Sequence, residues 1–118
     1  MQEFGEGDRY VLRIDVGEDL FEEIAGLARR RGIRAGIVSE GIGLLSQATL
    51  GYWNGREYAP RELSGAYEIV SVQGSIAEEE GRPSVHLHAA LAGPDQAVLG
   101  GHLMKGTVGL LAEILIEA

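Results

Sequence analysis

Cysteine is absent from the 118 residues of this sequence. Its absence excludes a disulfide framework, thiolate metal ligands and a thiol nucleophile, and it is compatible with a reducing cytosol. Long apolar runs are also absent, since no uncharged apolar segment approaches the roughly 20 residues of a membrane-spanning helix. The first ten residues, MQEFGEGDRY, lack the basic-then-apolar order of a signal peptide. We therefore expect a soluble cytoplasmic protein without a membrane contact.

Positive charge is scarce as well. The chain has 10 basic and 18 acidic residues, which gives a net charge of −8. Such a balance opposes binding to a phosphate backbone, so we expect no direct nucleic-acid binding by the isolated chain. The one basic cluster, residues 29–31, falls in the last turn of a predicted helix. We interpret it as a solvated helix end rather than as an anion-binding patch.

Glycine, by contrast, is abundant, with 18 residues. This content favours turns, bulges and close backbone approaches over long helices. The length suits a single domain with one hydrophobic core. We expect residues 1–8 to form a mobile leader and residues 9–118 to form that domain.

One helix is predicted together with both of its ends. Asp19 can accept hydrogen bonds from the free amides of the first turn, and Glu22 completes a pair that resembles a capping box. Gly32 suits the left-handed position that follows a helix. Between these ends, apolar residues recur at helical spacing, which predicts a buried stripe. The stripe consists of Leu20, Ile24, Leu27 and Ala28, widened by Phe21 and Ala25.

The rest of the chain has the period of two that indicates β-strands. Asn54-Gly55 predicts a type I′ hairpin turn between Trp53 and Arg56, and Pro60 places the returning strand at an edge or ends it. Residues 107–117 fit a buried helix as well as a strand, and we favour a strand because several strands precede them. The pattern predicts an α+β domain, an antiparallel sheet with one main α-helix on one face. The expected strands cover residues 9–16, 33–43 (running into a glycine-rich turn), 44–53, 56–63, 66–79, 83–92, 97–104 and 107–117.

Nucleotide-binding and serine-hydrolase motifs are not satisfied. Residues 41–43 (GIG) precede strand-like sequence, so no helix N-terminus would meet a pyrophosphate. Residues 105–107 (KGT) lack the Gly-Lys-Ser/Thr order of a phosphate-binding loop. No Gly-x-Ser-x-Gly motif occurs.

All three histidines lie in one short stretch. His86 and His88 are two residues apart, so on a strand they share a face at about 6.6–6.8 Å along the backbone. His102 lies in the next predicted strand, which can carry it to the other two. Neutral imidazole is the commonest zinc ligand, and three histidines leave a fourth position for water or a small anion. The alternative is that His86 and His88 are polar residues of a half-exposed strand and His102 is a hydrogen-bonded core residue.

Glu113 is a carboxylate within the apolar closing segment. A carboxylate there must face water or find a partner. It can orient a histidine from outside the metal's ligand set, or lie in a subunit contact. The spacing alone leaves both alternatives open.

Several motifs together resemble the PPC domain family (plants and prokaryotes conserved, also called DUF296). The resemblance extends from Arg9 to Glu117, and the hairpin around residues 50–58 is similar too. The combination of HLH and GGHL at this separation is its most specific part. The matching segments are residues 68–74 (EIVSVQG), 85–88 (VHLH) and 100–103 (GGHL), with Gly106.

The resemblance implies an antiparallel α+β fold assembled as a homotrimer. It also implies a zinc ion on His86, His88 and His102, because some prokaryotic members carry one on the matching histidines. In plant relatives the domain follows AT-hook DNA-binding motifs and serves chain association and contacts with nuclear proteins, whereas this sequence has no Arg-Gly-Arg-Pro-like hook.

Two functions from different classes follow from the residues and the resemblance together. The first is a homotrimeric binding module, regulatory or associated with DNA through partners. The second is a zinc-dependent enzyme that acts on a small, anionic substrate at an open three-histidine site. No general base is evident beside the histidines, which counts against the enzyme.

Overall fold

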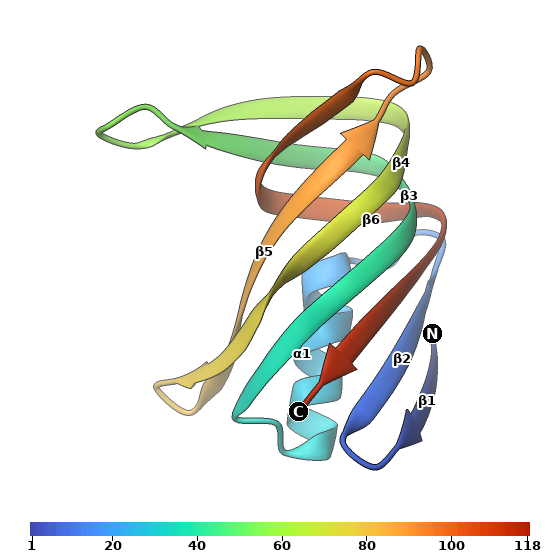
Figure 1. Ribbon diagram of the computed structural model, residues 1–118, viewed down its shortest axis with the longest axis vertical. Helices are drawn as coiled ribbons and strands as arrows, with labels where there is room; N and C mark the ends of the chain where they lie inside the picture. The colour runs from blue at the N-terminus through green and yellow to red at the C-terminus, as the bar shows by residue number, and fades with distance from the viewer.

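A computed structural model describes the whole chain, residues 1–118. The chain forms an antiparallel six-stranded sheet and one α-helix, which confirms the predicted α+β class (Figure 1). No helix has the length and hydropathy needed to cross a membrane. In chain order the elements are β1 (Gln2–Glu6), β2 (Arg9–Asp15), α1 (Leu20–Arg31), β3 (Ala35–Trp53), β4 (Tyr58–Glu79), β5 (Arg82–Ala92) and β6 (Val98–Glu117).

The sheet closes on itself at one end. Its strand order is β1-β2-β6-β3-β4-β5, and β5 also pairs with β6. The closing contact joins residues 87–92 of β5 to residues 98–103 of β6. Strands β3, β4 and β6 bend strongly along their length in Figure 1, which lets one sheet wrap around the core. Because β5 and β6 meet at this closure, segments from the second half of the chain lie side by side there.

The helix has the ends that the sequence predicted. The Asp19 carboxylate accepts a hydrogen bond from the backbone N–H of Glu22 at 2.9 Å, and Gly32 has a φ of 65°. These features satisfy amides of the first turn and let the chain leave the helix through a left-handed residue. The buried side chains of α1 are the predicted stripe, Leu20, Ile24, Leu27 and Ala28.

The prediction of a leader at residues 1–8 is wrong, because residues 2–6 form strand β1. This strand pairs with β2 through a tight turn at Gly7, whose φ is 63°. Glu3 ties β1 to the helix, since its carboxylate accepts hydrogen bonds from Arg30 and Arg31. Burial raises the pKa of Glu3, but the two guanidiniums outweigh it and hold the pKa below its usual value. Both arginines are therefore engaged within the chain.

The glycine-rich turn predicted after residue 40 is also wrong, because β3 runs without interruption through Gly41 and Gly43. The ladder between β3 and β6 shifts register on either side of this point, which marks a local irregularity rather than a reversal. Gly43 has a φ of 143°, and a Cβ there would collide with the backbone carbonyl of Leu111. Glycine here permits a close approach between two strands.

Other strands that were predicted separately are also joined into longer ones. Residues 56–63 and 66–79 were expected as two strands, and nearly all of them belong to β4. Likewise, β6 contains both residues 97–104, apart from Ala97, and residues 107–117, so the closing segment is confirmed as a strand. Pro60 lies within β4 where this strand pairs with β3 alone, which confirms its edge position.

The hairpin between β3 and β4 occurs where it was predicted, but its turn differs. The loop comprises residues 54–57, because Trp53 pairs directly with Tyr58. The Asn54 side-chain oxygen accepts hydrogen bonds from the backbone N–H groups of Arg56 and Glu57, both at 3.0 Å. A side-chain bond to the backbone thus replaces the expected two-residue type I′ turn.

The core consists of 23 buried hydrophobic residues from the helix, from five of the strands and, with Ile33, from the loop after the helix, and no polar residue is buried. Leu87 of β5 and Leu103 of β6 are nearly inaccessible at the closure. Since side chains alternate across a strand, their neighbours His86, His88 and His102 must point to the outer face.

Candidate metal centre

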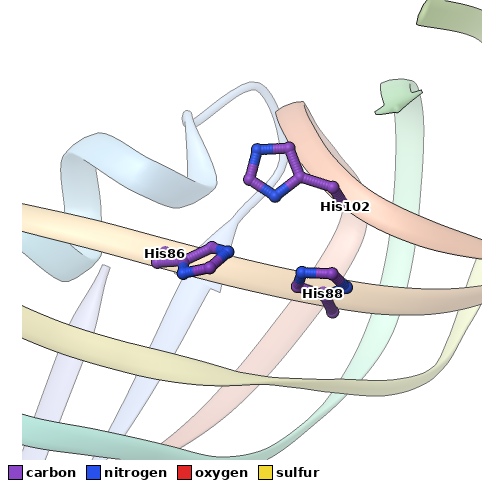
Figure 2. Close-up of side chains that lie close together, drawn as sticks. All are labelled: His86, His88 and His102. Carbon is purple, nitrogen blue, oxygen red and sulfur yellow. The ribbon is translucent and has the colours of Figure 1, made fainter. Parts of the chain in front are cut away.

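The structure brings the three predicted histidines together. His86 and His88 project from the same face of β5, and His88 is the direct cross-strand partner of His102 on β6. Figure 2 shows the three imidazoles facing one another across the closure. The period of two in β5 and the β5–β6 register therefore build the cluster, without a contribution from a loop.

The separations within the cluster suit one metal ion. The ring centroids lie 5.2 Å apart for His86 and His88, 5.1 Å for His86 and His102, and 5.3 Å for His88 and His102. One ring nitrogen from each residue lies within 4.8 Å of the others. A tetrahedral zinc with Zn–N bonds near 2.0–2.1 Å places its ligand nitrogens roughly 3.4 Å apart. Modest side-chain rotations would bring these nitrogens to that spacing.

His102 has an unpaired nitrogen, which tests whether a metal fits. Its Nδ1 is buried and has no hydrogen-bond partner. In Figure 2 one nitrogen of His102 points toward His86 and His88. Burial, followed by the nearby imidazoles of His86 and His88, lowers the pKa of His102 and favours the neutral ring. A buried polar atom without a partner is costly, and a neutral imidazole is the form that binds metal. The donor set therefore fits a zinc ion.

Aromatic residues of the β3–β4 hairpin border the histidines. The Tyr58 ring stacks on the His102 ring with a centroid separation of 4.5 Å and an interplanar angle of 27°. Trp53 meets Tyr58 edge to face at 5.4 Å. These neighbours carry no signal in the sequence, because their contact depends on the register between strands. The exposed pair nevertheless lies beside the Asn-Gly signal that marked the hairpin.

Glu113 is not part of this cluster, so its proposed role as an outer partner of a histidine is wrong. It pairs across strands with Ile42 and Arg13, far along β6 from His102. Its carboxylate accepts a hydrogen bond from the Arg13 guanidinium at 3.2 Å. The cation on the neighbouring strand is what compensates this half-buried carboxylate.

The family model for the Plants and Prokaryotes Conserved domain, abbreviated PCC or PPC, matches residues 1–118. The chain belongs to this family, which confirms the resemblance seen in the sequence.

Three relatives illustrate the relationship. The bifunctional protein GlmU of Synechococcus sp. (strain JA-3-3Ab) is 37% identical over 108 residues, which is 91% of this chain but 16% of that protein. A plant- and prokaryote-conserved protein from Pyrococcus horikoshii is 34% identical with a TM-score of 0.85, covering 94% of this chain and 78% of that one. A metal-containing protein from Archaeoglobus fulgidus is 33% identical with a TM-score of 0.86, covering 98% and 81%.

Proposed function

We propose that this chain is a zinc-binding module in which His86, His88 and His102 hold one ion. The observation that carries the proposal is the convergence of three imidazole nitrogens within 4.8 Å on one face of the sheet. The unpaired, buried Nδ1 of His102 supports it, since a ligand at this position would satisfy that atom. The description of the Archaeoglobus relative as metal-containing agrees with it.

A zinc ion on these residues would keep one coordination position for a small ligand. Structural zinc sites are closed by four protein ligands, whereas three leave a place for water or an anion. His86 and His88 are exposed, so solvent reaches this side of the cluster. We propose that a small molecule or anion occupies the position, and that the module senses or presents it in a regulatory role, with any association with DNA made through partners.

The experiment is a comparison of zinc content and calorimetric zinc titration for wild type, His88→Ala and His102→Ala. We expect about one zinc per chain in the wild type and a large loss of affinity in both variants, because each variant removes one of three ligands. Circular dichroism of the metal-free variants controls for folding. Equal zinc binding by all three proteins would reject the site.

A homotrimer is the second part of the proposal. The sheet exposes several large apolar side chains on β3, β4 and β6, and burial of such side chains against another copy would favour association. Ile42 and Leu110 line the same shallow hollow. The family resemblance suggests three copies rather than two. The exposed residues in question are Ile37, Ile42, Val70, Leu110 and Leu115.

The alternative function is a zinc-dependent enzyme. The observation that favours it is that only three candidate ligands converge, which would leave zinc a fourth position at which to activate water or polarise a small anionic substrate. Against it, the metal-ligating cluster contains only histidines, and no carboxylate joins them as a general base. Because the chain spans only 16% of the GlmU relative, the activity of that protein provides no argument for this one.

A cytoplasmic location completes the proposal, and the absence of cysteine supports it. If the protein is expressed in a reducing cytosol and isolated with full zinc occupancy, that result would agree with a cytoplasmic location.

A further inference from the structure

Tyr58 reaches His102 across an intervening strand. At this level β3 lies between β4, which carries Tyr58, and β6, which carries His102. Gly51 of β3 is the direct partner of His102 on one side and of Pro60 on the other. The aromatic ring therefore passes over Gly51 before it stacks on the imidazole.

Glycine at position 51 leaves the room for this contact. A Cβ at Gly51 would lie 3.2 Å from the Tyr58 ring, 3.3 Å from its Cβ and 2.9 Å from the Met104 sulfur. Contacts of this length force the neighbours to move. The backbone of Gly51 is close to fully buried beneath these side chains. An aromatic ring from a neighbouring strand that covers a glycine is a recurrent way to pin strand register.

The stack constrains His102, the one histidine of the cluster that shares its own strand with no other. His86 and His88 are held two residues apart on a single strand, whereas His102 comes from β6 and depends on its own side-chain torsions. Tyr58 lies against its ring at 4.5 Å, and Trp53 supports Tyr58 from the side at 5.4 Å. The arrangement restricts rotation of the imidazole whose Nδ1 is buried without a partner.

We propose that Tyr58 is a positioning residue of the metal centre, which holds the His102 ring ready to bind zinc, and that Gly51 is required for this role. The inference rests on the proposed zinc site. Residues that orient a metal ligand typically change affinity by about 10–100-fold when they are replaced. Because Tyr58 acts through stacking and not through its hydroxyl, its ring is the part that matters.

The test compares zinc affinities of wild type, Tyr58→Phe and Tyr58→Leu, measured by competition with a chromophoric chelator. Tyr58→Phe keeps the ring and is expected to bind zinc as the wild type does. Tyr58→Leu keeps apolar bulk without a ring plane and is expected to bind about tenfold more weakly. Equal affinity of all three proteins would overturn the inference, and so would an equal loss in Tyr58→Phe.

A spectroscopic readout separates positioning from general stability. Cobalt(II) replaces zinc, and its visible absorption reports the coordination geometry. We expect matching spectra for wild type and Tyr58→Phe and a shifted, weaker band for Tyr58→Leu. The melting temperatures of the metal-free variants are measured alongside. A spectrum of Tyr58→Leu identical to that of the wild type would contradict the proposed role.

Gly51→Ala provides an independent variant that leaves Tyr58 in the sequence. Its new methyl group displaces the ring, so zinc affinity should fall in the same direction as in Tyr58→Leu. The double variant should lose little more than Tyr58→Leu alone, since both changes disrupt one contact. Additive losses would contradict a shared cause. If the wild type itself takes up no zinc, the proposed function fails together with this inference. If it binds zinc and these variants bind equally well, the inference alone fails.

Discussion

His88 on β5 and His102 on β6 lie directly opposite each other in the pairing that closes the sheet. Their two strands meet nowhere else than in residues 87–92 and 98–103, so the histidine cluster exists only when this closure is formed. A ligand that binds both residues therefore holds the closure together. A metal ion bound at this site would therefore be coupled to folding.

The first prediction is that zinc raises thermal stability. A ligand present at about 100 times its dissociation constant stabilises the native state by roughly 2.7 kcal/mol. For a domain of this size such a gain corresponds to a rise in Tm of about 10 °C. Differential scanning calorimetry with zinc and then with excess EDTA would measure it. His88→Ala is the matched control and should show no zinc-dependent rise.

The second prediction concerns pH. Burial and the neighbouring imidazoles lower the pKa of His102 below its ordinary value of 6.5. Protonation of this residue therefore costs more free energy in the folded state than in the unfolded state. The contribution of the neutral imidazole to stability is lost as the pH falls below 6.5. Zinc also requires neutral imidazoles, so bound zinc should be released over the same range. Equilibrium dialysis from pH 7.5 to 5 measures the release, and full occupancy at pH 5 would contradict the prediction.

The third prediction separates the two faces of β5. Leu87 lies between the two histidines in sequence and is completely buried on the opposite face. Leu87→Ala should destabilise the metal-free protein by about 2–5 kcal/mol through the cavity it leaves. His88→Ala, on the exposed face, should change the same free energy by no more than about 0.5 kcal/mol. Urea unfolding in EDTA measures both, and similar values would show that the site is part of the structural core.

The helix and the histidine face were predictable because each depends on local sequence. Asp19 and Gly32 mark the ends of α1 by their own chemistry, and the two-residue spacing of His86 and His88 sets a common face in any strand. The position of His102 beside His86 and His88 could be expected only because it lies in the strand that follows theirs. Its pairing with His88 depends on a register that the loop between β5 and β6 imposes.

The missed features depend on contacts between distant segments. Gly43 lies in a glycine-rich segment that is typical of a turn. In the structure, however, the carbonyl of Leu111 on β6 lies so near that Gly43 marks a point of close approach between two strands. Glu3 has no local signal for a strand, and its two partners lie on the helix. Tyr58 reaches His102 only because the glycine between them belongs to a third strand. None of these relationships is encoded within a single sequence window.

The fourth prediction is the assembly state. Light scattering coupled to size exclusion should give three times the 12.6 kDa chain mass at micromolar concentration. Ile42→Glu places a charge at a side chain that is 52% exposed in the single chain and should weaken the trimer without loss of fold. Arg56→Glu, in the hairpin loop, is a charge-changing control away from Ile42. A monomer mass for the wild type would reject the homotrimer.

The last prediction concerns nucleic acid. Affinity for duplex DNA depends mainly on neutralisation of phosphates by basic side chains, and this chain carries a net charge of −8. The largest basic cluster is partly neutralised, since Arg30 and Arg31 both pair with Glu3. We therefore expect no shift of a DNA duplex by sub-micromolar protein at physiological salt. Glu3→Gln frees both guanidiniums and tests whether this pairing alone masks a DNA-binding surface. A wild-type shift that weakens steeply with added salt would show direct phosphate contacts and contradict the prediction.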